Sequence, residues 1–167
     1  MRGAAVSPSF HRARCRMTRQ LIVAVFGSVE TARQAANDFE ALSEKNEGFH
    51  IENGVVVEKD ANGKLAVLDA ESRPFKGGVI GAIAGGLLGL LAGPLGVVTG
   101  MAAGAGAGIL AQAAGNALLD GTFVETVAAR LVPGSVAVIL EAKEDTPFSV
   151  DNVVTGFGGK VFRQTLD

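Results

Sequence analysis

The chain has 167 residues, of which 48% are hydrophobic and 19% charged, and its formal net charge is −2. This length suits one domain that carries an insertion, and the hydrophobic share is enough to build a core. All nine aromatic residues are phenylalanine, and without aromatic platforms or a basic patch nucleic-acid binding is not expected.

The first residues of the chain differ from the rest. Residues 1–16 carry four of the 15 basic side chains and no acid, so the remainder has 11 basic against 17 acidic residues. We expect residues 1–18 to be a basic leader that is disordered or precedes the true start at Met17, although its composition also resembles a transit peptide. The single cysteine, Cys15, lies in it and has no partner for an internal disulfide.

The first regular elements follow directly. The apolar, β-branched run at residues 20–26 predicts a buried strand. Ser28 is the expected N-cap of an amphipathic helix over residues 29–45, where apolar side chains recur at helical spacing.

A hairpin is predicted next. Residues 49–59 and 64–70 have strand patterns, and Asp60-Ala61-Asn62-Gly63 between them supplies turn-forming residues. The order up to this point is therefore strand, helix, strand, strand.

From residue 77 to residue 119 the chain has no charged side chain, and its glycines recur every fourth position. Pro94 separates two such series, which are Gly77, Gly81, Gly85, Gly89 and Gly93, then Gly96, Gly100, Gly104 and Gly108. Residues four apart share a helix face, and a face without side chains lets another backbone approach closely. We predict that residues 76–118 form a glycine-zipper helical hairpin that turns at Pro94, with these glycines as its helix-packing positions.

This segment needs an environment that compensates for its composition. It has 13 glycines and 11 alanines in 43 residues, and each glycine costs a helix in water ~1 kcal/mol relative to alanine. A bilayer enforces helix because the backbone must bond to itself, whereas in a soluble homo-oligomer the hairpins would bury one another. Arms of ~24 and ~33 Å fit a hydrocarbon core of ~30 Å only marginally, but the first arm has a greasy outer face, and we favour the membrane. Collapse of the hairpin onto its own sheet is the remaining alternative.

Regular structure resumes after the insertion. Thr122 and Glu125 have capping-box spacing and predict a helix through Leu131. A strand is expected at residues 135–143.

Two short elements complete the chain. Thr146 before Pro147 predicts an N-cap with proline at the first helical position. Glycines at residues 156–159 indicate where this helix ends rather than a phosphate loop, because no Ser or Thr follows Lys160. The last strand is expected at residues 159–165.

The predicted fold class is α+β. Without the insertion the order is βαββαβ followed by a short helix and a strand, and the first six elements match a ferredoxin-like split βαβ sheet. Residues 19–75 and 119–167 would form this domain. The hairpin insert at 76–118 lies between the third strand and the second helix, in a surface connection that tolerates extra chain.

The layout resembles a family of short bacterial proteins catalogued as predicted membrane proteins of unknown function, domain-of-unknown-function family 1269. The similar pieces lie in nearly everything after Met17 and read LIVAVFGS, VVVEKDANGKLAV, GGLLGLLAGPLG, VPGSVAVILEAKE and FGGKVFRQTL. The resemblance implies a membrane association and no catalytic residues.

No constellation of side chains predicts a reaction. His11 and His50 have no partners at metal-ligand spacing, so neither a metal nor another cofactor is expected. The acids Glu141, Glu144 and Asp145 are expected to form a solvated strand edge, since paired carboxylates need a cleft to shift their pKa values. The chain is therefore not expected to be an enzyme.

The sequence favours a non-enzymatic, membrane-associated protein. Its hairpin would insert in the bilayer and self-associate, and the α+β domain would face the cytoplasm, because Arg73 and Lys76 precede the first arm. The expected partners are other copies of the chain and the lipid of the inner membrane, with no nucleic acid and no small-molecule substrate identified. The alternatives are a cytoplasmic homo-oligomer with a structural or stress-related role and, by analogy of fold only, a small-molecule sensor.

Overall fold

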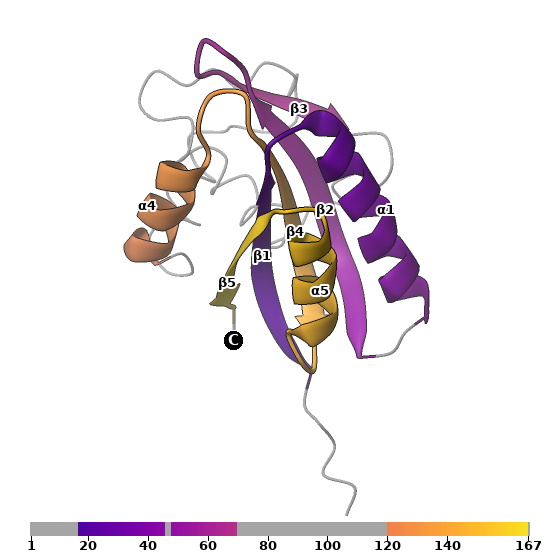
Figure 1. The fold of residues 1–167 in the computed structure, drawn as a ribbon. Coiled ribbons are helices and arrows are strands. Elements are labelled where there is room, and N and C mark those ends of the chain that lie inside the picture. The colour runs from indigo at the N-terminus through magenta and orange to yellow at the C-terminus, as the bar shows by residue number, and fades with distance from the viewer. Residues whose placement is uncertain (1–16, 46–47, 70–119, 167) are drawn as a thin grey trace, which may run out of the picture.

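The computed structural model describes residues 17–45, 48–69 and 120–166, which form a five-stranded antiparallel sheet and three helices (Figure 1). In chain order the elements are β1 (Thr18–Phe26), α1 (Val29–Lys45), β2 (Phe49–Lys59), β3 (Leu65–Asp69), α4 (Gly121–Arg130), β4 (Val136–Glu144), α5 (Phe148–Gly156) and β5 (Lys160–Thr165). The α+β class is confirmed, and so is each strand and helix predicted within these ranges, to within two residues at its ends.

The order of strands in the sheet is β3-β2-β4-β1-β5. β4 pairs along nearly its whole length with β1 on one side and with β2 on the other. Its first seven residues are all buried, which is the pattern of a strand with neighbours on both edges and cover on both faces. The six-element unit expected from the sequence contains β3 but not β5. In the structure β5 pairs with β1 at one edge of the sheet, and β3 lies at the opposite edge.

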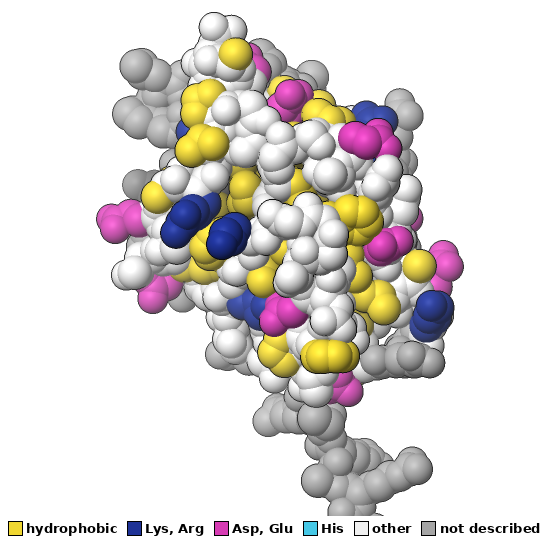
Figure 2. All heavy atoms as spheres, in the orientation of Figure 1, with side chains coloured by type: hydrophobic (Ala, Val, Ile, Leu, Met, Phe, Trp, Pro, Cys, Tyr) yellow, Lys and Arg dark blue, Asp and Glu magenta, His cyan; other side chains and the backbone are white. Residues whose placement is uncertain are grey.

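Both faces of the sheet are apolar. Successive side chains along a strand point to opposite faces, so the apolar residues of each strand contribute to two separate clusters. On the α1/α5 face, residues of the sheet pack against α1 and α5, and the buried members of this cluster include Ile22, Ala24, Phe26, Val56, Val138 and Leu140 with Ala32, Phe39, Val150 and Val154. On the α4 face the cluster includes Leu21, Val23, Val25, Val55, Val57 and Ile139 with Val127 and Leu131. Figure 2 shows the α1/α5 side, where apolar side chains lie between the helices and acidic and basic ones are scattered around them.

Two local predictions about turns and caps are confirmed. The Ser28 hydroxyl accepts a hydrogen bond from the Thr31 amide at 3.2 Å, as an N-cap does. In the hairpin, Asp60 Oδ1 accepts from the amides of Asn62 and Lys64 at 2.8 and 2.9 Å. Gly63 has a φ of 80°, which glycine adopts without strain.

Two predicted caps are wrong. The N-cap of α4 is Asp120, whose carboxylate accepts from the Thr122 amide at 2.7 Å. Thr122 therefore lies inside the first turn, and the proposed capping box with Glu125 does not start the helix. In α5 the N-cap residue is Pro147, which has no side-chain acceptor, so Thr146 lies outside the helix. Both errors are shifts of one or two residues, within which local pattern does not resolve helix ends.

The end of α5 agrees with its prediction. The helix ends at Gly156, the amide of Gly158 donates to the Thr155 carbonyl at 3.0 Å, and Gly158 has a φ of 70°. This is a helix terminus of the kind that favours glycine. The glycines here therefore lead from α5 into β5.

Candidate functional site

The predicted helix-packing glycines and the predicted turn at Pro94 lie outside the described residues, as does the whole insert at 76–118. The basic leader up to Arg16, with His11 and Cys15, lies outside them too. Among the helices in residues 17–45, 48–69 and 120–166, none combines the length and the apolar character needed to cross a bilayer.

The acids near the end of β4 do not form a solvated edge, so that prediction is wrong for two of the three. Glu141 and Glu144 are only 1% and 2% exposed, and only Asp145 is exposed. Three residues apart in a strand, Glu141 and Glu144 point to opposite faces of the sheet. The central place of β4 buries both side chains, which a strand at the edge of the sheet would not do.

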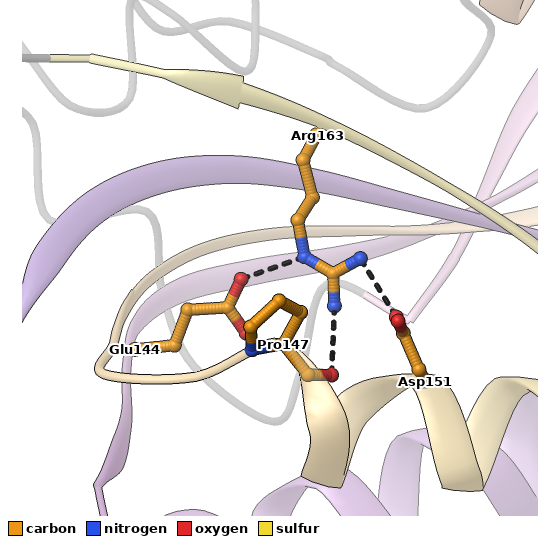
Figure 3. A network of polar contacts seen from close by, with 4 residues as sticks. All are labelled: Glu144, Pro147, Asp151 and Arg163. Atoms are coloured by element: carbon orange, nitrogen blue, oxygen red, sulfur yellow. Dashed lines mark hydrogen bonds and ion pairs between the residues drawn. The ribbon is translucent and has the colours of Figure 1, made fainter.

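Glu144 is bound to Arg163 on the α1/α5 face (Figure 3). Arg163, on β5, donates from Nε to Glu144 Oε1 at 2.6 Å and from Nη2 to the Pro147 carbonyl at 3.2 Å. Its Nη1 lies 2.7 Å from Asp151 Oδ1. One guanidinium thus joins the end of β4, the start of α5 and β5. This is a structural network that holds the β4–α5 corner, because every charged group in it is already paired within the chain.

Burial raises the pKa of Glu144 above its ordinary value of 4.5, and the hydrogen bond and charge of Arg163 act in the opposite direction. The charge of Asp151 adds a smaller upward effect. Because the arginine is 19% exposed and the acid almost wholly buried, removal of the carboxylate would leave a partly buried guanidinium with one partner fewer.

Glu141 lies on the α4 face in a different setting. Its cross-strand neighbours are Leu21 on β1 and Asn53 on β2. Neither carboxylate oxygen has a hydrogen-bond partner, although both are buried. Burial raises the pKa of Glu141, against the opposing charge of Arg19; the charge of Glu52 raises the pKa further, and the neighbouring Asn53 side chain lowers it by a smaller amount.

Burial favours the protonated, neutral form of Glu141. A buried carboxyl without a partner is most stable in its neutral form. Nearby on β4, Lys143 binds Glu52 at 2.5 Å, so the charges beside Glu141 are already partly matched. The sequence signal for this site is a glutamate between Leu140 and Ala142 in an otherwise apolar strand. From the sequence this side chain is expected to be solvated, which is wrong.

A cavity of about 260 Å³ lies between α1 and the sheet on the α1/α5 face. Its lining residues are Arg33, Ala36, Asn37, Glu40, Ile51, Gly54, Val55, Val56, Val138 and Leu140. Ala36 on the helix and Gly54 on β2 have little or no side chain, which leaves room between the two elements. A Cβ atom at Gly54 would lie 2.9 Å from Leu140 Cδ2.

Sequence reasoning missed this cavity. Its one sequence signal is Gly54, because a glycine inside a strand often marks a bulge or a site of close approach. β2 does have a register irregularity against β4 between Ile51 and Asn53. The cavity is slightly smaller than most small-molecule pockets, and the polar side chains in its lining, Arg33, Asn37 and Glu40, all belong to α1.

In the part of the chain that the structure describes, no three His, Cys, Asp or Glu residues are grouped so that they could hold a metal ion. His50 is an exposed residue of β2. The residues with unusual environments are therefore the two buried glutamates and the lining of the cavity.

Comparisons with known proteins add one match. The model of a family described as a protein of unknown function, DUF1269, matches residues 78–167, which is more than half of the chain. No curated protein matches, and no solved structure matches. The matched range covers α4, β4, α5 and β5 together with most of the uncharged stretch.

Proposed function

The chain belongs to the DUF1269 family of proteins of unknown function, and from that premise we propose that it is a non-enzymatic, membrane-associated protein. Residues 76–118 insert in the bilayer as a glycine-zipper hairpin and self-associate, and the α+β domain is held at the cytoplasmic surface of the inner membrane. The observation that carries the proposal is the run of 43 residues without a charge between β3 and α4.

The positions of the two elements that flank this run, β3 before it and α4 after it, are compatible with a hairpin. β3 is at one edge of the sheet, and the Asp120 amide at the start of α4 donates to Gln164 Oε1 of β5, at the other edge, at 3.0 Å. Four strand spacings separate these edges by ~19 Å. The axes of two packed helices are ~9 Å apart. Residues 70–76, if extended, can span ~23 Å, which is enough to cross the distance between the two edges. Both arms of a hairpin can therefore start from one patch beside the domain.

We also propose that the sheet is a split βαβ arrangement whose six elements are β1, α1, β2, β4, α5 and β5. This differs from the grouping expected from the sequence, which counts β3 and α4 among the six; here β3, the insert and α4 are the additions. β1, α1 and β2 leave a gap that β4 fills, and α5 leads from β4 to β5 on the far side of β1. The addition then lies entirely in the connection from β2 to β4. A connection at the surface accepts such chain without disturbance of the core.

Membrane fractionation of cells that express the full chain tests the proposal. We expect the protein in the membrane pellet after a carbonate wash, and protease added from the periplasmic side should leave the α+β domain intact, since Arg73 and Lys76 favour a cytoplasmic domain. Recovery as a soluble monomer would overturn the proposal. A large particle that needs no detergent would instead favour the soluble homo-oligomer.

Self-association is tested separately. Replacement of both Gly85 and Gly89 by leucine fills the stripe that would let the helices approach, so we expect loss of oligomers in detergent, measured by light scattering after size-exclusion chromatography. Membrane retention should be unchanged, because leucine is more apolar than glycine. Oligomers of unchanged size in the double variant would contradict the zipper.

A further inference from the structure

A groove of about 180 Å³ lies between α1 and α5. Its lining residues are Asp38, Ala41, Leu42 and Lys45 of α1 and Val153 of α5. Figure 1 shows the two helices side by side on one face of the sheet, and Figure 2 shows the same side of the molecule with apolar side chains between them. Ala41 is exposed, and Leu42 and Val153 are half-buried. The last two turns of α1 thus carry an apolar surface that the described residues leave partly uncovered.

Two opposite charges flank this surface. Asp38 and Lys45 are seven residues apart, so they lie on one side of α1, two turns or ~10 Å from each other along the axis. The α1 positions three or four residues from either charge hold only glutamine, alanine and leucine. Neither side chain has a hydrogen bond or an ion pair within the described ranges. Each charge therefore lacks an opposite charge within reach on its own helix.

The order of these four residues is complementary to itself. Asp38 precedes Ala41 by three residues, and Lys45 follows Leu42 by three. When two copies of α1 cross in opposite directions about a two-fold axis between Ala41 and Leu42, Asp38 of each copy faces Lys45 of the other. Ala41 then faces Leu42, a small side chain against a large one. A two-fold interface between identical chains requires this kind of self-complementarity, and a small residue at the crossing point lets two helix axes approach closely.

We propose that the groove between α1 and α5 joins the α+β domains of two copies of this chain. The occupant of the groove is α1 of the second copy. Leu42 of each copy packs on Ala41 of the other beside Val153, and an ion pair between Asp38 and Lys45 closes each end of the contact. The contact lies wholly within the described domain, so it rests neither on membrane insertion nor on the glycine zipper. Two short helices bury less area than a standard interface, so the pairing is weak and forms where copies are concentrated.

Site-specific cross-linking of the full chain in detergent micelles tests the contact. In a Cys15→Ser background, which removes the native thiol, Ala41→Cys places one thiol of each copy beside the two-fold axis, where a short bismaleimide can join them. Glu125→Cys is the matched control, because Glu125 is an exposed residue of α4, on the other face of the sheet. We expect at least about tenfold more dimer from Ala41→Cys, since pairing raises the local concentration of its thiols.

Charge exchange tests the register of the pairing. Asp38→Lys places two lysines together at each end of the contact, and Lys45→Asp places two aspartates together. Either variant alone should dimerise about threefold to tenfold less, because exposed ion pairs are weak. A mixture of the two, distinguished by a tag of different size, restores opposite charges at both ends and should give more mixed dimers than like ones. Both exchanges in one chain should also restore the dimer. Both positions are exposed, so these variants keep the core intact.

The proposal fails if Ala41→Cys and Glu125→Cys cross-link equally, or if the mixture of single variants gives no excess of mixed dimers. It fails as well if the thiol of Ala41→Cys is shielded from a maleimide in dilute, monomeric protein, since another part of the same chain would then cover the groove.

The carbonate wash and the replacement of Gly85 and Gly89 by leucine report on the proposed function alone, because neither alters the charges of α1. The cross-link at Ala41→Cys should therefore persist in that glycine variant when the protein concentration is raised. Its loss there at every concentration would show that the zipper alone brings the domains together.

Discussion

Replacement of Glu141 by glutamine should stabilise the protein near neutral pH, although most substitutions at buried positions destabilise. The side chain is almost wholly buried on the α4 face, and neither carboxylate oxygen has a hydrogen-bond partner. Burial raises its pKa more than the charge of Arg19 lowers it. The folded protein therefore retains a proton that the unfolded chain releases near its ordinary pKa of 4.5.

The sign of the pH dependence follows from this difference. The contribution of Glu141 to stability is fully present below the unfolded pKa and is lost as the pH rises through the higher, folded pKa, at ~1.4 kcal/mol for each unit between them. Glutamine does not titrate, and it leaves a buried polar group but not a charge. We therefore expect a gain at about pH 8 of ~1.4 kcal/mol for each unit by which burial raises the pKa, reduced by the cost of burying the glutamine amide. The gain should vanish near pH 4, where the acid is neutral.

Urea denaturation of the full chain in detergent micelles, at a series of pH values, measures the difference between Glu141→Gln and the unaltered protein. Glu144→Gln is the matched control, since Glu144 is equally buried but paired with Arg163 at 2.6 Å. Loss of that carboxylate leaves Arg163 with Asp151 as its charged partner, which opposes the gain from removal of a group whose pKa burial raises, so we expect a smaller gain near neutral pH than for Glu141→Gln. The reasoning is refuted if Glu141→Gln is less stable than the unaltered protein at about pH 8, or if the difference does not change with pH.

Two further predictions concern packing and capping. Gly159→Ala should cost ~1–3 kcal/mol of stability, because its Cβ would lie 2.6 Å from Cε1 of the buried Phe26 ring. The control Gly156→Ala, whose Cβ would have no atom within 4 Å, should cost less than ~0.5 kcal/mol. Equal urea midpoints for the two variants would contradict this prediction. Asp120→Ala removes the acceptor for the Thr122 amide and should cost ~1 kcal/mol, with faster hydrogen exchange confined to the start of α4. Unchanged exchange there would show that the cap does not hold the helix.

The elements that sequence reasoning predicted well are those whose signals lie within one short segment. The helix at residues 29–45 and its cap at Ser28 follow from helical spacing and one local acceptor. The hairpin at Asp60–Gly63 follows from an aspartate that binds its own turn and from a glycine at positive φ. Hydrogen bonds between near neighbours in the chain decide all three, so no knowledge of the rest of the fold is needed.

The candidate sites were predicted poorly because each depends on residues far apart in the chain. Glu141 and Glu144 were assigned to solvent since nothing local shows that β4 lies between β1 and β2. The cavity requires Ala36 and Gly54 to face each other across two elements. Arg163 meets Glu144 only because α5 returns the chain to pair β5 with β1.

Alone, the order of the amino acids determined which segments of the described domain are strands and helices, where its hairpin turns and that its class is α+β. Tertiary structure decided the order of the strands, the burial of two glutamates on opposite faces and the hollow under α1. The physical reason is range: periodicity and capping act over a few residues, whereas desolvation and cavities depend on which distant surfaces come into contact.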